Sequence, residues 1–159
     1  MTTLYVREGE NFREAPAQDV LDRAQALIAQ RYRPGTPVLT SPKRTRDFLK
    51  LRLGALEYEL FSVLFLDKRN RLIEFVELFR GTIDGAQVHP REVVKEALNR
   101  NAAAVIFCHA HPSGVASPSQ ADELITQRLK EALALIDIRV LDHIIIGETI
   151  TSFAELGLL

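Results

Sequence analysis

The chain has 159 residues, of which 47% are hydrophobic and 26% are charged, and its formal net charge is −1. These values fit one globular domain with a substantial core, and they lack the general basic excess that nucleic-acid-binding domains usually show. A single cysteine excludes an internal disulfide. Because the sequence shows neither a signal peptide nor an apolar stretch of about 18 residues, we expect a cytoplasmic protein without a membrane-spanning segment.

The first 40 residues are predicted to form an N-terminal helical extension, followed by the main domain at 41–159. Residues 18–31 carry apolar side chains at helical spacing, and the segment Arg33–Pro37, with two prolines and a glycine, ends that helix. The sequence leaves open whether the extension packs on the domain, covers a sheet edge or mediates self-association.

The main domain is predicted to alternate between helices and strands. Helical spacing and helix-start signals indicate helices at 42–53, 90–99 and 118–136. Apolar runs indicate strands at 59–66, 72–79, 103–108, 139–146 and 150–153. We expect the last two helices to face the core with Val93, Val94, Ala97, Leu98, Leu124, Ile125, Leu129, Ala132, Leu133 and Ile136. This order favours an α/β fold, with a mixed sheet flanked by helices in three layers.

Basic side chains are concentrated in two nearby segments, at Lys43, Arg44, Arg46, Lys50, Arg52, Lys68, Arg69 and Arg71. We interpret them as a solvated helix face followed by a polar turn. The alternative is a contact with DNA through these side chains. A nucleic-acid partner is therefore kept open, although the net charge does not support it.

Two histidines follow the apolar run that forms the predicted strand at 103–108. His109 and His111 stand two residues apart, so their side chains point the same way, while the side chain of Cys108 points the opposite way. We interpret Cys108 as a small core residue rather than a metal ligand. Alternatively, the two histidines are ordinary surface residues at a strand end.

A helix start soon after the histidines adds two more polar groups. Ser117 is the expected N-cap, with Pro118 as the first helical residue and Gln120 as the reciprocal capping partner. Ser119 and Asp122 are three residues apart on this helix and therefore share a face. A strand end and a helix start, joined by a short loop, would thus direct the polar groups to one point.

Two imidazoles and one carboxylate, from His109, His111 and Asp122, form a ligand set typical of a catalytic zinc site. The fourth position of such a site stays free for water. The sequence therefore predicts one zinc-like ion per chain.

The spacing H-x-H-x7-S-x2-D over residues 109–122 resembles the motif of the JAMM (MPN) metalloprotease superfamily. The segments 79–83, 89–94 and 141–147 resemble its RadC branch, and the likeness covers roughly residues 42–150. It implies a three-layer JAMM/MPN-type domain with a mixed, curved sheet. RadC proteins commonly carry an N-terminal helix-hairpin-helix region with no obvious counterpart here, so the chain resembles short RadC-like proteins of mobile elements.

The resemblance also implies an activity, the hydrolysis of an amide or isopeptide bond by a zinc-dependent metallopeptidase. The superfamily needs a glutamate before an apolar strand to deprotonate the metal-bound water. Glu59 matches that position best, Glu57 is the runner-up, and Glu74 and Glu77 are weaker candidates. By the same resemblance, Ser119 donates a hydrogen bond to the oxyanion that forms.

Two further histidines need an interpretation. We expect His143, in a strand, to be a hydrogen-bonded, partly buried residue. Alternatively, its neighbour Asp142 orients a ligand or balances charge near the site. His89, before Pro90, is interpreted as a helix-entry residue.

The alternative to catalysis is a non-catalytic metal-binding scaffold, or a DNA-repair or mobile-element accessory protein that binds protein or DNA. One cysteine excludes a zinc nucleobase deaminase with its H-x-E and P-C-x-x-C motifs. An imidazole-rich site with ligands for one ion disfavours a two-metal nuclease. The protein or peptide substrate and the oligomeric state are not defined by the sequence.

Overall fold

The computed structural model describes residues 4–31, 42–81 and 87–159. The chain divides into two compact units, residues 1–32 and 33–159. Among the described residues, no helix combines the length and the apolar character needed to cross a membrane.

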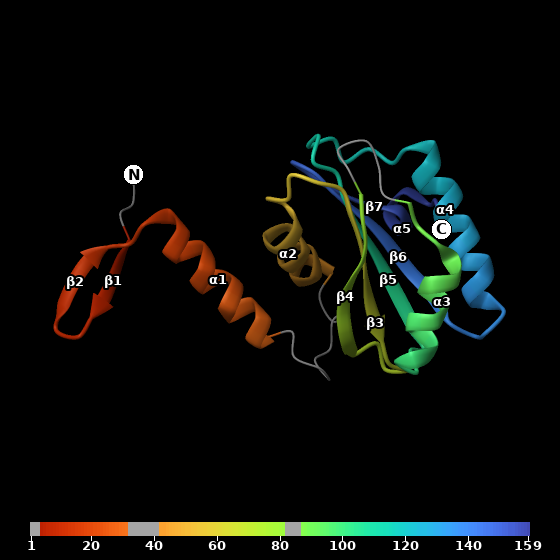
Figure 1. The fold of residues 1–159 in the computed structure, drawn as a ribbon, viewed down its shortest axis with the longest axis horizontal. Coiled ribbons are helices and arrows are strands. Elements are labelled where there is room, and N and C mark those ends of the chain that lie inside the picture. The colour runs from red at the N-terminus through yellow and green to blue at the C-terminus, as the bar shows by residue number, and fades with distance from the viewer. Residues whose placement is uncertain (1–3, 32–41, 82–86) are drawn as a thin grey trace. The chain divides into compact units, whose positions relative to one another are not determined.

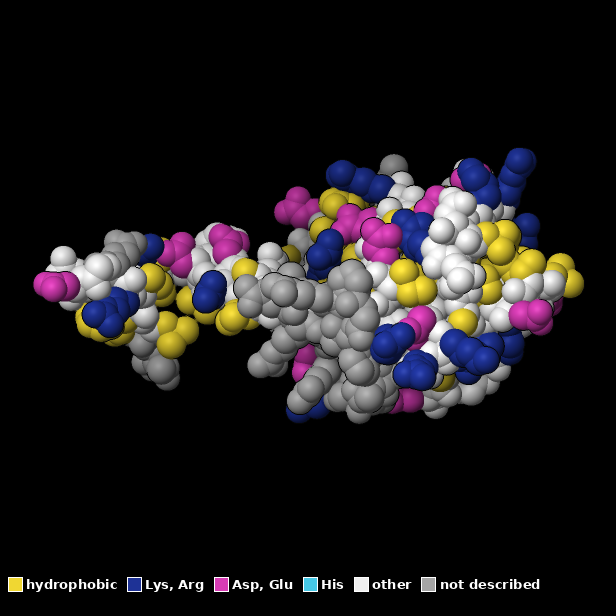
Figure 2. Space-filling view, turned by 90° about the horizontal axis from the view of Figure 1, so that it is seen from below, with side chains coloured by type: hydrophobic (Ala, Val, Ile, Leu, Met, Phe, Trp, Pro, Cys, Tyr) yellow, Lys and Arg dark blue, Asp and Glu magenta, His cyan; other side chains and the backbone are white. Residues whose placement is uncertain are grey.

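The first unit contains a β-hairpin and a helix. Strands β1 (Tyr5–Glu8) and β2 (Asn11–Glu14) pair antiparallel, and helix α1 (Ala17–Arg31) follows. The predicted helix is confirmed, and the hairpin before it is an addition that the sequence pattern did not indicate. Strands of four residues are too short for a clear alternating pattern, and Gly9 makes their tight turn at a φ of +64°. Exposed apolar side chains mark the surface of this unit (Figure 2): Leu4, Tyr5, Phe12, Leu21 and Leu27.

The second unit is built on a five-stranded sheet with the order β4-β3-β5-β6-β7. Only the pairing of β5 with β6 is parallel, and the other neighbours are antiparallel. The strands are β3 (Leu60–Leu66), β4 (Leu72–Arg80), β5 (Ala104–Ala110), β6 (Arg139–Ile146) and β7 (Ile150–Ser152). This mixed sheet confirms the predicted strands to within a few residues at their ends.

Helices cover both faces of the sheet (Figure 1): α2 lies on one face, and α3 and α4 lie on the other. The helices are α2 (Pro42–Leu53), α3 (Pro90–Asn99), α4 (Gln120–Ala134) and the short α5 (Phe153–Leu156). The predicted three-layer α/β class is therefore confirmed. Helix α5 was not predicted; Ser152 caps its start, and Gly157 ends it in the left-handed conformation.

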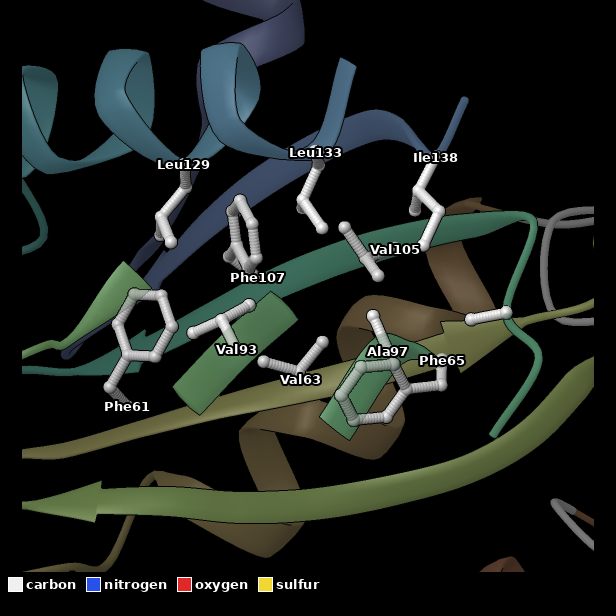
Figure 3. Close-up of a cluster of buried hydrophobic side chains, with 11 residues drawn as sticks. Phe61, Val63, Phe65, Val93, Ala97, Val105, Phe107, Leu129, Leu133 and Ile138 are labelled. Atoms are coloured by element: carbon white, nitrogen blue, oxygen red, sulfur yellow. The ribbon is translucent and has the colours of Figure 1, made fainter. Parts of the chain in front are cut away.

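The main core lies between the sheet and the helices α3 and α4 (Figure 3). Alternate residues of β3 and β5 meet the helices there: Phe61, Val63, Phe65, Val105 and Phe107. Leu129 and Leu133 are fully buried, as predicted, but Leu98 and Leu124 are 56% and 61% exposed, so their assignment to the core was wrong. Leu124 stands nine residues from Leu133, which is half a turn out of phase on an α-helix.

The two basic segments lie on α2 and in the turn between β3 and β4, as interpreted from the sequence. Several of their charges pair with acidic side chains, since Arg46 contacts Glu155 and Arg71 contacts Asp67 at 2.6 Å. Lys50 instead donates a hydrogen bond to a backbone carbonyl, that of Glu148. These contacts fit a solvated helix face and a polar turn.

Candidate metal centre

Strand β5 delivers the first histidine from the middle of the sheet. His109 is the penultimate residue of β5, between β3 and β6, and it is 7% exposed. His111 lies just beyond the strand, but its backbone N–H still donates to the carbonyl of Ile146 on β6 at 2.8 Å. The extended backbone thus continues past the strand end and keeps both imidazoles on one side of the sheet.

The loop after β5 fixes the orientation of the second imidazole. His111 Nδ1 lies 2.8 Å from the carbonyl oxygen of Val115. Because a carbonyl can only accept, Nδ1 carries the hydrogen and Nε2 keeps its lone pair for a ligand. The loop packs closely on the β6–β7 turn, where a Cβ on Gly147 would lie 2.3 Å from the carbonyl oxygen of Gly114. The absence of a side chain at Gly147 therefore permits the loop to pack this closely on the turn.

Helix α4 begins two residues later than the sequence indicated. Ser119, not Ser117, is the N-cap, and Asp122, not Gln120, is its capping partner. Ser119 Oγ accepts the Asp122 N–H at 3.1 Å, and Asp122 Oδ2 accepts the Ser119 N–H at 2.8 Å. Asp122 can close such a reciprocal pair only with the residue three positions before it, Ser119, which accounts for the later start.

Two carboxylates hold the His109 ring between them. Asp122 Oδ1 lies 2.8 Å from Nδ1, and Glu59 Oε2 lies 3.1 Å from Nε2. Burial lowers the pKa of His109, but the hydrogen bonds and charges of Asp122 and Glu59 outweigh burial, so the net pKa is raised. Burial alone would raise the pKa of Asp122, yet its bonds to His109 and Ser119 hold that pKa well below its usual range. The site therefore favours a positive charge between its carboxylates.

Three side chains could share one metal ion. One donor atom from each of Glu59, His109 and His111 lies within 4.8 Å of the others. Asp122 is adjacent, with Oδ2 at 3.6 Å from His111 Nε2, but its oxygens also bond to His109 and to the helix cap. Among the described residues the group that meets this distance thus contains Glu59 rather than Asp122, which lies beside it. The division into ligands and base, with Asp122 as a ligand and Glu59 as the base, stays a prediction.

His143 is fully buried behind His109, with the two rings nearly parallel at 9° and their centroids 6.2 Å apart. Burial and the neighbouring His109 lower the pKa of His143 to about 3, so the ring is neutral. Its Nδ1 bonds to the hydroxyl of Thr126, whereas its Nε2 has no hydrogen-bond partner in the described part of the chain. The expected hydrogen bond is thus present for one nitrogen only.

Thr126 is the residue of this neighbourhood that sequence reasoning missed. The hydroxyl also bonds to the backbone of Asp122, one helical turn earlier. The available signal was its position four residues after Asp122, which places both on one face of the helix.

Cys108 lies on the opposite face of the sheet from His109 and is fully buried, which agrees with its interpretation as a core residue. Burial raises the pKa of its thiol, which disfavours the thiolate.

The fold has three layers around a mixed sheet. Two histidines lie at the end of one strand, and a capped aspartate lies at the start of the following helix. These features define a domain of the JAMM/MPN (JAB) class with a candidate metal site. Residues 39–158 match the family described as RadC-like JAB domain. The chain belongs to this family, as the resemblance in its sequence implied.

Individual relatives support the assignment. The chain is 57% identical over 139 residues to a UPF0758 protein of Vibrio cholerae serotype O1, covering 87% of this chain and 88% of the relative. It is 69% identical over 123 residues to a UPF0758 protein of Nitrosococcus oceani, covering 77% of this chain but only 55% of that relative. Some relatives thus have a longer chain around the shared domain.

Proposed function

We propose that the chain is a zinc-dependent hydrolase of the metallopeptidase or isopeptidase type. The observation that carries this proposal is the convergence of Glu59, His109 and His111, whose donor atoms lie within 4.8 Å of one another, with Asp122 beside them. Nitrogen and carboxylate oxygen donors in this number suit zinc. Asp122 and Glu59 also place two carboxylates beside the His109 ring, and their negative charge would offset that of a divalent cation.

In this proposal His109, His111 and Asp122 hold the zinc. The ion would supply an acidified water and a Lewis acid for the carbonyl of the substrate. The Nδ1–H of His111, fixed by the Val115 carbonyl, and the cap of Asp122 by Ser119 keep two of the ligands in place. Metal binding thus uses groups that the fold has already oriented.

Glu59 is the proposed general base. Its side chain is 16% exposed and lies beside His109, so its carboxylate can meet a water that enters the site. The carboxylate would take a proton from that water and deliver it to the leaving amine. Ser119 would stabilise the oxyanion, but its single hydroxyl proton now points to Asp122 Oδ2 at 2.6 Å. The hydroxyl must therefore rotate to serve the substrate.

The test combines metal analysis with hydrolysis of a panel of fluorogenic peptide and isopeptide probes. We expect about one zinc per wild-type chain, which His109→Ala and Asp122→Ala should lose. Glu59→Gln should keep the zinc and lose hydrolysis, because its amide cannot accept the proton. The matched control is Glu57→Gln, an exposed glutamate two residues earlier, which should leave both properties unchanged.

Other results would overturn parts of this assignment. If Asp122→Ala retained stoichiometric zinc and Glu59→Gln lost it, then Glu59 rather than Asp122 would be the third ligand. A wild-type chain that takes up no zinc, even when zinc is supplied, would refute the metal site. Zinc binding without hydrolysis of any probe would favour the scaffold alternative.

A further inference from the structure

A pair of buried polar side chains connects helix α4 with strand β6 behind the candidate metal centre. Thr126 is 2% exposed and lies one helical turn after Asp122. Its hydroxyl donates to the Asp122 carbonyl at 2.5 Å and lies 2.6 Å from His143 Nδ1 on β6. The hydroxyl thus links the helical turn that contains Asp122 to strand β6 of the sheet.

The chemistry of these groups fixes the direction of the hydrogen bonds. A threonine hydroxyl has one hydrogen, and the Asp122 carbonyl can only accept it. The second bond of the hydroxyl must then be accepted from His143, which places the ring hydrogen on Nδ1. His143 Nε2 is left as a bare acceptor, and no donor among the described residues reaches it.

The ring of His143 is held tightly in this orientation. It packs against Phe61, Phe107 and Phe153, with centroid distances of 5.7, 5.9 and 4.7 Å, and it lies parallel to His109. A fully apolar side chain would fill such a pocket without leaving a buried nitrogen unpaired, which is unfavourable. An imidazole at this position therefore needs a reason other than packing.

We propose that Thr126 and His143 are positioning residues that hold the Asp122 turn of α4 at the distance required for the metal site. His143 donates to Thr126, and Thr126 donates to the backbone of Asp122, whose Oδ1 reaches His109 at 2.8 Å. The donor group itself consists of Glu59, His109 and His111, and Asp122 lies beside it through its bond to His109. The inference rests on the proposed function, because the position of Asp122 matters through the ion that it would hold.

The test compares two substitutions at one position. Thr126→Val keeps the shape and removes the hydroxyl, whereas Thr126→Ser keeps the hydroxyl and removes a methyl group. We expect Thr126→Val to weaken zinc affinity by about 10–100-fold, as loss of an outer-shell partner does. Thr126→Ser should restore near-wild-type affinity and the wild-type visible spectrum of the cobalt-substituted protein. Wild-type affinity and spectrum in Thr126→Val would overturn the proposal, whatever its thermal stability.

A second measurement tests the hydrogen bonds from His143 to Thr126 and from Thr126 to Asp122, here called the relay, without any metal. In the ¹⁵N spectrum of the zinc-free chain, His143 should be neutral with its hydrogen on Nδ1, and Thr126→Val should shift the His109 ring nitrogens while Thr126→Ser does not. A hydrogen on Nε2, or an unmoved His109, would refute the relay. If the wild type bound no zinc while these shifts appeared, the proposed function would fail and the positional coupling would stand.

Discussion

Ser119 is at once the start of a helix and a neighbour of the candidate metal centre. Its hydroxyl accepts from the Asp122 N–H and donates to the Asp122 carboxylate. Ser152 caps helix α5 by accepting from the Glu155 N–H, but it donates to Asp142 on β6, at 2.6 Å. Both serines are therefore N-caps, and only Ser119 bonds to Asp122, the neighbour of His109.

This pair allows the role in capping to be separated from the proposed role in catalysis. Ser119→Ala and Ser152→Ala should each lower the free energy of unfolding by about 0.5–2 kcal/mol, because each removes an N-cap. Only Ser119→Ala should also reduce hydrolysis of a probe, by roughly 10²–10³-fold, since an oxyanion donor is lost. Urea unfolding and steady-state kinetics measure the two effects. Equal activity of both variants would leave Ser119 with the structural role alone.

Helix α4 combines two functions along one face. Its first turns present Asp122 and Thr126 to the site, and the following turns bury Leu129 and Leu133 in the main core. These residues follow one another at intervals of three or four, which keeps them on the same side of the helix. Packing of the apolar end therefore fixes the direction in which the polar end points.

Truncation of the buried part should accordingly have a large effect. Leu129→Ala should destabilise the domain by about 2–5 kcal/mol, because the side chain is fully buried and leaves a cavity. The control on the same helix is Leu124→Ala, whose side chain is 61% exposed and which should change stability by no more than about 0.5 kcal/mol. Chemical unfolding measures both. Similar losses in the two variants would show that the face of α4 is misassigned.

The elements that the sequence predicted well are those with a strong apolar pattern. The seven residues of β3 and of β5 are all buried, and their largely apolar sequences made the strands plain. The start of α4 was less certain because Ser117 and Ser119 are both good caps. The choice depends on Asp122, which closes the capping box only with Ser119. The hairpin β1–β2 was missed because each strand has only four residues and β2 is exposed along its length.

The motif likewise predicted which side chains meet, but not how they are oriented. Strand alternation placed His109 and His111 together, and the structure brings Glu59 to the same point from 50 residues away. The carbonyl of Val115, which sets the tautomer of His111, is a backbone group and leaves no trace in the residue pattern. The relay through Thr126 depends on the contact between α4 and β6 in the folded domain, which cannot be predicted from the spacing of residues along the chain.

At the scale of the whole molecule, the two units differ in how much they bury. Every buried residue in the described part of the chain lies between Thr45 and Phe153, in the second unit. The first unit, of about 32 residues, exposes its apolar side chains, and chains of this size rarely support a core of their own. The stability of the domain that contains the candidate metal centre should therefore come from the second unit.

A fragment of residues 41–159 tests this directly. We expect it to unfold cooperatively with a midpoint within about 4 °C of the full chain, which corresponds to a change of roughly 1 kcal/mol for a domain of this size. Its zinc affinity should match that of the full chain, because Glu59, His109, His111 and Asp122 all lie inside it. Calorimetry and chelator competition measure the two quantities. A fragment that folds but binds zinc more weakly would show that the first 40 residues contribute to the site, and one that fails to fold would show that they complete the core.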